Sequence, residues 1–419
     1  MSPIMLASLA FGLFAASAAT ATPLVVRDKA PITIPFTRRF NFTGESTLAE
    51  MDRIRAQSFM CGCGRGNGCN YVSEQSAAAT IFDTDATNGA VDYTISTGIG
   101  SPPTYYTLIV DTGSSNTWVG ADQAYVQTRT SEATGETVSV TYGSGSFEGN
   151  EYTDTVTLAS GFAIAGQSIG VATTSDGFDG VDGILGLGPE DLTCGTLSNE
   201  DECIATVTQN AYSQGLVSAQ EIGISFEPTT SLSDANGELT FGGTDSNKYT
   251  GTITYTAVTT TEPASYYVGI EESITYGSDT AIMSSSAGIA DTGTTLILLP
   301  SSAYAKYAKA TGATYDDDTG LLRLTTTQYD KLESLYFTIG GVSYELTANA
   351  QIWPRSLNTA IGGTSDYVYL IVNDLGSSAE TGLQFINGMT FLERFYFVYN
   401  SGTNEVGFAT TSYTDATTN

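Results

Sequence analysis

Alternation of apolar and polar residues predicts short β-strands along most of the chain after about residue 78. Segments 93–99 and 105–110 are rich in β-branched and aromatic residues and are separated by Gly and Pro, which is typical of strands joined by turns. Residues 136–158 alternate around Gly143-Ser144-Gly145, which predicts a hairpin with a glycine-rich tip. Helical patterns are short and fall at 206–216, 301–310 and 325–335. The pattern predicts an all-β body with a few short helices.

The N-terminal part of the chain differs from this body. Residues 4–16 are almost wholly apolar and are followed by small residues, which predicts a signal peptide over 1–21. The apolar run is too short to span a bilayer as a helix. Residues 22–77 contain a helix-like piece at 46–57 and the sequon Asn41-Phe42-Thr43. We expect a prosegment here, the alternative being a flexible tail.

Charge supports the docking of such a prosegment. The chain has a formal charge of −30, yet seven of its fifteen Lys and Arg residues lie within residues 1–77. A basic strip can therefore cover an acidic body until acid breaks the contacts. The acidic body is expected to repel nucleic acid and anionic membranes. In such a field the pKa of folded-state carboxyls should rise, which favours folding at low pH.

The sequence contains no His. A Ser-His-Asp or Cys-His triad and a His-based zinc site are therefore excluded. Proton transfer must come from carboxylates, Lys or Tyr. We expect neither a metal nor another cofactor.

The five cysteines fall into two groups. Cys194 and Cys203 close a short polar loop in the body and are expected to form a disulfide in an exported protein. Cys61, Cys63 and Cys69 lie in the N-terminal part. A metal site there would lack an obvious fourth ligand, so we interpret the odd cysteine as part of a segment that is removed.

Two near-copies of one tripeptide are the candidates for the chemistry. Asp111-Thr112-Gly113 is followed by Ser114, and Asp291-Thr292-Gly293 is followed by Thr294; each copy comes after an apolar strand, and the two aspartates are 180 residues apart. One such tripeptide easily marks a plain turn. Two with the same flanks, one in each half of the body, indicate a duplicated site.

The residue types suit a pair of coupled carboxyls. An apolar strand brings each Asp into a partly dry place where ionisation is costly. The Gly lets backbone approach the carboxylate closely, and the following hydroxyl can donate to its outer oxygen. If the two loops meet at a pseudo-twofold axis, one carboxyl can be ionised and accept a proton from water, while the other donates to a carbonyl oxygen. Asp111 and Asp291 are thus predicted to be catalytic.

From about residue 78 onward the sequence resembles the pepsin-like aspartic proteases, and their fungal members most. The resemblance rests on the run from Asp111 to Trp118, on 142–146, on 178–186 and on 385–396. It implies a bilobed all-β fold with pseudo-twofold symmetry and hydrolysis of proteins and peptides in acid. In one departure, Met389 follows Gly388 where the family commonly has Asp.

The resemblance also implies roles for single residues. Tyr142, Gly143 and Ser144 would form a flap over the substrate, with Tyr142 hydrogen-bonded to Trp118. Ser144 is not acidic, so we expect a preference for bulky apolar residues around the cut. Basic leader residues would cover the carboxylates in a zymogen, and the sequence leaves three candidates open. These are Lys29, Arg38 and Arg39.

Together these interpretations predict an N-terminal lobe at 78–255 and a C-terminal lobe at 256–419, with the activation cut between Gln57 and Thr80. The product would be a monomer, secreted or delivered to an acidic vacuole, and inhibited by its own prosegment. Two other functions fit the sequence less well. A binding or inhibitory protein on this fold would be suggested by a lost Asp or Gly, and neither is lost. A carbohydrate-active protein leaves the paired tripeptides unexplained, and opposed loops place the carboxyls too close for an inverting glycosidase.

Overall fold

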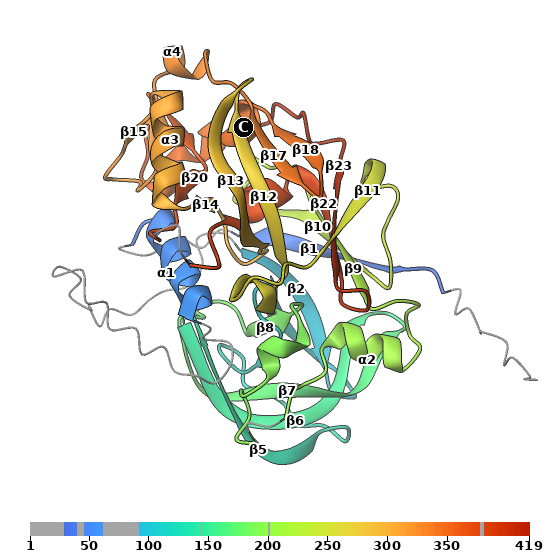
Figure 1. Ribbon diagram of the computed structural model, residues 1–419. Helices are drawn as coiled ribbons and strands as arrows, with labels where there is room; N and C mark the ends of the chain where they lie inside the picture. Colours follow the sequence, from blue (N-terminus) through green and yellow to red (C-terminus); the bar gives the residue numbers. More distant parts are fainter. Residues whose placement is uncertain (1–28, 40–45, 62–91, 144, 200–201, 378–380) are drawn as a thin grey trace, which may run out of the picture.

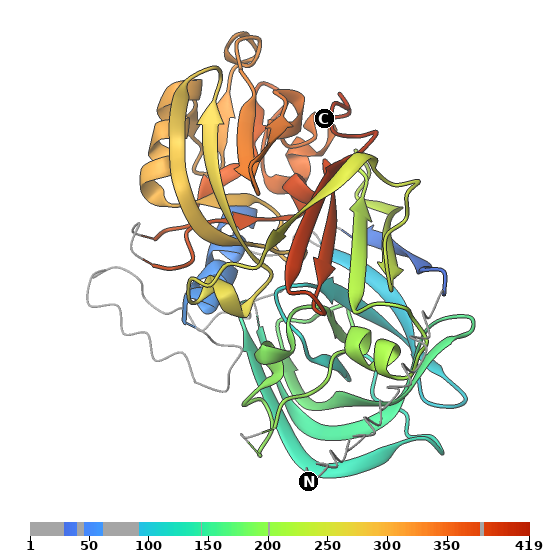
Figure 2. The same ribbon diagram turned by 45° about the vertical axis from the view of Figure 1, so that its right-hand side comes forward.

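The computed structural model describes residues 29–39, 46–61, 92–143, 145–199, 202–377 and 381–419. These residues form many strands and few short helices, which confirms the predicted mostly-β class. Figures 1 and 2 show two lobes, with helix α1 at their junction. The predicted signal peptide, the sequon and the residues from Gly62 to the predicted start of the body lie outside the described residues.

A sheet of thirteen strands joins the lower lobe to the middle of the molecule. Its order is β11-β23-β22-β9-β10-β1-β2-β3-β8-β4-β7-β6-β5, so strands from the C-terminal end lie beside strands from the first half. The bounds are β1 Ile32–Arg39, β2 Asp92–Ile99, β3 Thr104–Asp111, β4 Thr117–Val119, β5 Glu132–Tyr142, β6 Gly145–Ala159, β7 Phe162–Asp176, β8 Gly183–Gly186, β9 Glu221–Phe226, β10 Ser233–Phe241, β11 Thr250–Ala257, β22 Phe395–Asn400 and β23 Glu405–Thr410.

A seven-stranded sheet and a three-stranded sheet make up the upper lobe. The larger has the order β18-β17-β12-β13-β21-β14-β20, and the smaller β15-β16-β19. The bounds are β12 Gly269–Tyr276, β13 Thr280–Ala290, β14 Ile297–Leu299, β15 Thr314–Tyr315, β16 Leu322–Leu324, β17 Leu335–Ile339, β18 Val342–Leu346, β19 Val368–Leu370, β20 Val372–Asp374 and β21 Ile386–Asn387.

The helices are short, and local sequence explains their ends. Helix α1 begins with a capping box, in which Thr47 and Glu50 exchange hydrogen bonds. Gly312, with a φ of +70°, ends α3. The α-helices are α1 Leu48–Cys61, α2 Val207–Ser213, α3 Ser301–Thr311, α4 Thr326–Tyr329 and α5 Met389–Leu392, and the 3-10 helices are Glu190–Thr193, Ala264–Tyr266, Asn349–Gln351 and Arg355–Ile361.

The helix predicted at 325–335 is much shorter in the structure. Only α4 is helical, and Leu335 already begins β17. Strand β17 pairs with both β12 and β18, so its burial in the sheet outweighs the helical pattern of the sequence. The other three predicted helices, at 46–57, 206–216 and 301–310, are present with small shifts.

The predicted internal duplication is visible in the strand pairing. In the first half, β3 pairs antiparallel with β2 and parallel with β8, and β8 pairs antiparallel with β4. In the second half, β13 pairs in the same senses with β12 and β21, and β21 with β14. Buried apolar side chains such as Val110 and Ile289 fill the interior behind both motifs. Each motif delivers one Asp-Thr-Gly to the junction between the lobes.

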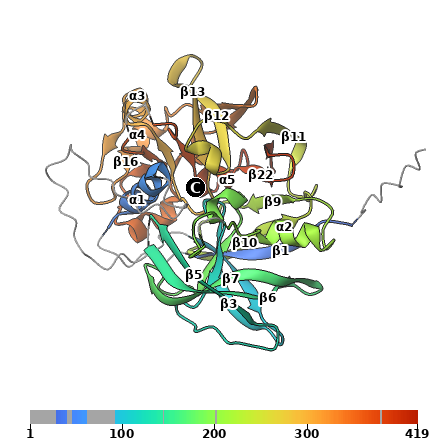
Figure 3. The same ribbon diagram turned by 60° about the horizontal axis from the view of Figure 1, so that its bottom comes forward.

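The N-terminal strand β1 is built into the large sheet. It pairs with β10 and with β2, and Arg38 is buried there and donates to the carbonyl oxygen of Thr229. Figures 1 and 3 show α1, which follows this strand, between hairpin β5–β6 and the upper lobe. In the described part of the chain, no helix combines the length and the apolar character that crossing a membrane requires.

Candidate active site

The two Asp-Thr-Gly loops meet at the junction of the lobes. Asp111 ends β3, and Asp291 directly follows β13. Both side chains are almost fully buried, with exposures of 1% and 0%. Since each strand before them is apolar and buried, the two carboxylates reach the same dry interior from opposite lobes.

The threonines of the two loops hold the lobes together. The backbone N–H of Thr112 donates to Thr292 Oγ1, and the N–H of Thr292 donates to Thr112 Oγ1, both at 3.0 Å. Thr292 Oγ1 also donates to the carbonyl oxygen of Val110 at 2.9 Å. This reciprocal exchange of buried hydrogen bonds fixes the two aspartates relative to each other.

Each carboxylate is held by its own loop. Ser114 Oγ donates to Asp111 Oδ2 at 2.5 Å, and Thr294 Oγ1 donates to Asp291 Oδ2 at 2.6 Å. The N–H groups of Gly113 and Gly293 donate to the Oδ1 atoms of the same aspartates, at 2.9 and 3.1 Å. The structure therefore places the hydroxyls and glycines where the sequence predicted them.

Glycine is required in both loops because the opposite carboxylate is so close. A Cβ atom at Gly113 would lie 2.6 Å from Asp291 Oδ1, and one at Gly293 would lie 2.7 Å from Asp111 Oδ1. Any other residue would push the carboxylates apart. The two loops thus face each other across a very short gap.

Arg55 of helix α1 fills this gap. Its Nη2 atom donates to Asp111 Oδ1 at 2.6 Å and to Asp291 Oδ1 at 3.2 Å, and its Nε donates to Asp291 Oδ2 at 2.8 Å. The guanidinium also lies 5.0 Å from the centre of the Phe59 ring. One buried cation therefore binds both carboxylates at once.

The two carboxyls have different affinities for a proton. Burial raises the pKa of Asp111, and the nearby charge of Asp291 adds to this rise, against the opposing charge of Arg55. Burial also acts on Asp291, but the charge and the hydrogen bonds of Arg55 outweigh it, so the pKa of Asp291 is lowered. With Arg55 docked, Asp291 is therefore the more acidic of the two carboxyls.

A second side chain of α1 anchors the helix on the Asp291 loop. Asp52 is buried and accepts hydrogen bonds from the N–H groups of Thr295 and Leu296, at 3.1 and 2.7 Å. Burial raises the pKa of Asp52 to about 7, although both backbone bonds and Arg55 oppose the rise. On the same helix, Arg53 donates to the carbonyl oxygen of Asp374 in β20.

Hairpin β5–β6 forms as the sequence predicted, and Gly143 near its tip lies against helix α1. Tyr142 and Trp118 lie buried in one apolar cluster, and each makes an edge contact with Phe178. The Trp118 indole lies within reach of the Tyr142 hydroxyl, and its hydrogen bond counteracts the large rise in the pKa of Tyr142 that burial causes. The alignment of this predicted bond is poor, so neither polar atom has a partner with good hydrogen-bond geometry among the described residues. Ser144 lies outside the described residues.

Two cavities flank Arg55. One is lined by Asp111, by Tyr142 and by apolar side chains that include Ile109 and Ile184. Asp92, at the start of β2, lies on the same wall; burial raises its pKa to about 6, against the charges of Arg55 and Arg39. The other cavity lies between Ser58 and Phe59 of α1, hairpin β5–β6 and Tyr267. Arg55 of α1 lines both cavities.

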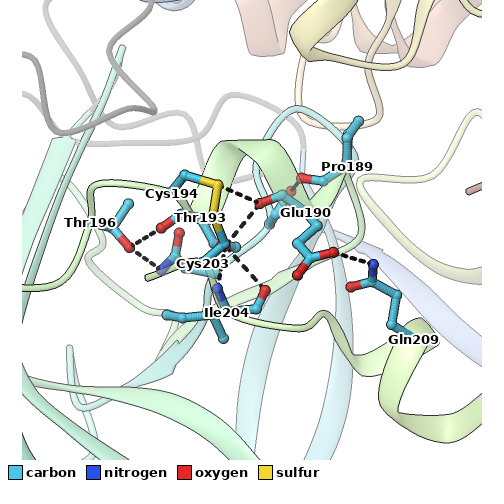
Figure 4. Close-up of a disulfide and its surroundings, with 10 residues drawn as sticks. Pro189, Glu190, Thr193, Cys194, Thr196, Cys203, Ile204 and Gln209 are labelled. Carbon is cyan, nitrogen blue, oxygen red and sulfur yellow. Dashed lines mark hydrogen bonds between the residues drawn. A yellow bond between two sulfur atoms is a disulfide. The ribbon is translucent and has the colours of Figure 1, made fainter. Parts of the chain in front are cut away.

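The predicted disulfide is present. Cys194 and Cys203 are bonded, and Figure 4 shows the loop that they close. Thr193 exchanges hydrogen bonds with the backbone of Ile204 across this loop. The side chain of Cys61 and the whole of Cys63 and Cys69 are not among the described parts of the chain.

The structure corrects the choice of the basic residue that covers the carboxylates. None of the three candidates occupies that place: Lys29 is exposed, Arg38 bonds to Thr229, and Arg39 donates to the carbonyl oxygen of Gly180. Arg55 occupies it instead. One sequence feature could have identified Arg55. It lies three residues after Asp52 in a capped helix, and this spacing places both side chains on one face of the helix.

Comparison with known proteins gives a consistent result. The family model described as eukaryotic aspartyl protease matches residues 92–411. Polyporopepsin of Irpex lacteus is 65% identical over 335 residues, which are 80% of this chain and 98% of that protein. Gastricsin of Homo sapiens is 31% identical over 74% of this chain and 79% of its own length. The crystal structure of an aspartic proteinase from Irpex lacteus has a TM-score of 0.78 and 56% identity, covering 93% of this chain and all of that one. These matches confirm the predicted resemblance and the predicted fold.

Proposed function

The chain belongs to the eukaryotic aspartyl protease family and is an aspartic endopeptidase, and we propose that Asp111 and Asp291 are its catalytic residues. One observation carries the assignment: a single nitrogen of Arg55 contacts both carboxylates, so two symmetry-related acids lie within reach of one small group. The threonine cross-links hold this geometry without relying on Arg55.

In the proposed reaction, Arg55 has left and the two carboxyls share one proton. The ionised carboxylate takes a proton from a water molecule, whose oxygen then attacks the carbonyl carbon of the peptide bond. The protonated carboxyl donates to the carbonyl oxygen and stabilises the tetrahedral intermediate. The carboxyl that took the proton from water then gives it to the amide nitrogen, the C–N bond breaks, and the two products are released while the other carboxyl recovers its proton. Ser114 and Thr294 keep the outer oxygens in place throughout.

The walls of the site support a preference for bulky apolar residues around the cut. Ile109, Phe178 and Ile184 line the cavity beside Asp111 under Tyr142. Burial of an apolar side chain against them would contribute roughly 25 cal/mol for each Å² removed from water. Tyr142 and Gly143 would close over the bound peptide, with Trp118 packed behind them. Cleavage mainly after Lys would contradict this preference.

We further propose that the chain is made as a zymogen. Helix α1 holds the carboxylates through Arg55 and the adjoining loop through Asp52, so a substrate cannot enter while it is docked. Acid would protonate the carboxyls that bind Arg55 and release the helix. Removal of the segment up to a point between Gln57 and Thr80 would then leave a mature monomer.

The proposed place of action is outside the cell or in an acidic vacuole. The apolar stretch at residues 4–16 has the features of a signal peptide. The Cys194–Cys203 disulfide supports export, because disulfides persist in oxidising compartments.

Digestion of denatured haemoglobin at pH 3–4 tests the function. We expect the wild type to cleave it, pepstatin to abolish cleavage, and Asp291→Asn to lose at least about 10³-fold in rate. Asp366→Asn, an exposed carboxyl that lines neither cavity of the site, is the matched control and should keep full activity. Cleavage that resists pepstatin, or an active Asp291→Asn variant, would refute the mechanism. Pepstatin binding without any cleavage would instead identify a binding protein on this fold.

A further inference from the structure

A buried acid and a buried amide lie behind the Asp291 loop. Glu272 of β12 is 1% exposed and Asn387 of β21 is fully buried. Asn387 Nδ2 donates to Glu272 Oε2 at 2.7 Å. The other oxygen of each group, Glu272 Oε1 and Asn387 Oδ1, is also buried and has no hydrogen-bond partner among the described residues.

One proton on the carboxyl would satisfy both orphaned oxygens. A protonated carboxyl has one donor and one acceptor, and a primary amide has the complementary pair. A proton on Oε1 could therefore be donated to Asn387 Oδ1, which closes a ring of two hydrogen bonds. An ionised carboxylate would instead leave two acceptors buried without donors, which is costly.

The first lobe shows that the fold does not need this polar pair. By the duplicated strand pairing, Thr97 of β2 stands where Glu272 stands in β12, and Leu185 of β8 stands where Asn387 stands in β21. Both equivalents are buried, and neither carries a charge or an amide. The acid–amide pair is therefore a special feature of the lobe that carries Asp291.

Asn387 links this pair to the candidate catalytic loop. The backbone N–H of Asp291 donates to the carbonyl oxygen of Asn387 at 3.1 Å, and Asn387 pairs with Ala290 in the sheet. We infer that Glu272 is a positioning residue for Asp291: its carboxyl stays protonated and holds the Asn387 side chain, and thereby the strand on which the Asp291 backbone rests. The inference rests on the proposed catalytic role of Asp291.

The surroundings of Glu272 favour the protonated form. Its cross-strand neighbours are Ser286 of β13 and Ile339 of β17, both uncharged. Burial raises the pKa of Glu272 to about 8, and the only opposing influence is the bond from Asn387; no charged group in the described chain contributes. Because the pKa is raised in the folded state, this contribution to stability is complete below about pH 4.5 and is lost as the pH rises towards 8.

Glu272→Gln tests the inference, because a glutamine amide offers the same donor and acceptor at every pH. In the acid-activated enzyme, with active sites counted by pepstatin, we expect kcat/KM for an uncharged peptide at pH 4 to stay within about twofold of wild type. The basic limb of the pH profile should move up by at least about half a unit. The fall in Tm between pH 4 and pH 8 should shrink by at least about 3 °C.

Asn387→Asp should shift the basic limb of the kcat/KM profile in the opposite direction. Two carboxyls must then form the hydrogen-bonded ring, so the ring should break, and kcat/KM should begin to fall, at a lower pH than in the wild type. The matched control is Glu151→Gln, a second buried acid whose pKa is raised to about 7. It lies in β6 of the thirteen-stranded sheet and accepts a hydrogen bond from Ser168 of β7, so it belongs to a different sheet from β12 and β21. It should change the pH dependence of Tm and leave the kcat/KM profile unchanged.

The inference is overturned if Glu272→Gln keeps the wild-type basic limb, or if Glu151→Gln shifts that limb equally. Failure of the proposed function is a separate result. In that case neither the wild type nor any of these variants would cleave the peptide, whatever the Tm values show.

Discussion

At the scale of residues, the site depends on a few side chains that bond across the molecule. Thr112 and Thr292 exchange hydrogen bonds between positions 180 residues apart. Arg55 reaches the carboxylates from a helix that precedes both lobes in sequence. Because Arg55 and its partners are buried, this ion pair is held by good geometry and little solvent screening.

Loss of the Arg55 charge should make the zymogen easier to activate. In Arg55→Met the pair no longer has to be broken by acid, so self-processing should begin about one pH unit or more above the wild-type onset. The measurement is the fraction of processed chain after incubation at each pH. Arg53→Met is the matched control, since Arg53 lies on the same helix but contacts the Asp374 backbone instead of the carboxylates. Equal onset in both variants would show that Arg55 is not the acid-sensitive contact.

At the scale of elements, helix α1 and hairpin β5–β6 are in direct contact, and each blocks the movement of the other. A Cβ atom at Gly143 would lie 2.1 Å from the Cα of Arg55, and its three nearest neighbours all belong to α1. The tip of the hairpin is therefore pressed directly against the helix backbone. The helix occupies the space into which the hairpin would otherwise close.

Gly143→Ala should weaken the docking of α1 without lowering the thermal stability of the processed chain. The added methyl must push the helix backbone away, at a cost of about 1–3 kcal/mol to the unprocessed form. Thermal unfolding of the chain before and after acid processing measures this. We expect a lower Tm than wild type before processing and an equal Tm afterwards. A similar loss in both forms would place the strain within the hairpin.

At the scale of the whole molecule, buried carboxyls tie stability to acid. Burial raises the pKa of Asp52 and of Glu151 to about 7 and that of Glu272 to about 8. Asp154 has a lowered pKa, because bonds from Thr130, Tyr125 and Ser131 outweigh its burial. The contribution of Asp154 to stability is lost only as the pH falls below the usual range of carboxyl pKa values. It therefore does not offset, between pH 4 and pH 8, the contributions of the carboxyls whose pKa is raised.

The protein should therefore be more stable at pH 4 than at pH 8. A carboxyl with a raised folded-state pKa favours folding most below its unfolded pKa, and this contribution is lost as the pH rises through the folded value. For the three raised groups that window runs from about pH 4 to pH 8. We expect Tm to fall by about 10 °C or more across it, measured by calorimetry. A higher Tm at pH 8 would contradict the argument.

The chain has a formal charge of −30, so repulsion between surface charges could also make Tm depend on pH. Measurement of Tm at high salt distinguishes this repulsion from the effect of the buried carboxyls. At 1 M salt, repulsion between exposed charges is screened within about 3 Å, whereas the cost of burying a charge is little affected. The difference in Tm should therefore persist at high salt. Its disappearance would attribute the effect to surface charge instead of the buried acids.

The sequence by itself determined the features that depend on local chemistry. The two Asp-Thr-Gly motifs, their hydroxyls, the hairpin at 136–158 and the Cys194–Cys203 pair could all be predicted, because each is a short run whose residue types directly constrain the backbone or the bond. The duplication of the site across the two halves of the body also followed from these repeats. The strand at residues 335–339 could not be predicted, because its burial between two neighbouring strands overrides the helical preference of the local sequence.

Only the tertiary structure decided which distant groups meet. It brought Arg55 to the carboxylates in place of Lys29, Arg38 or Arg39, and it paired Asp52 with the Thr295 and Leu296 backbone. It also placed Tyr142 beside Trp118 in a poorly aligned hydrogen bond. It also set Glu272 against Asn387. These contacts depend on angles and burial accumulated over many strands, and a side chain's partner and its affinity for protons follow from that packing and not from its neighbours in sequence.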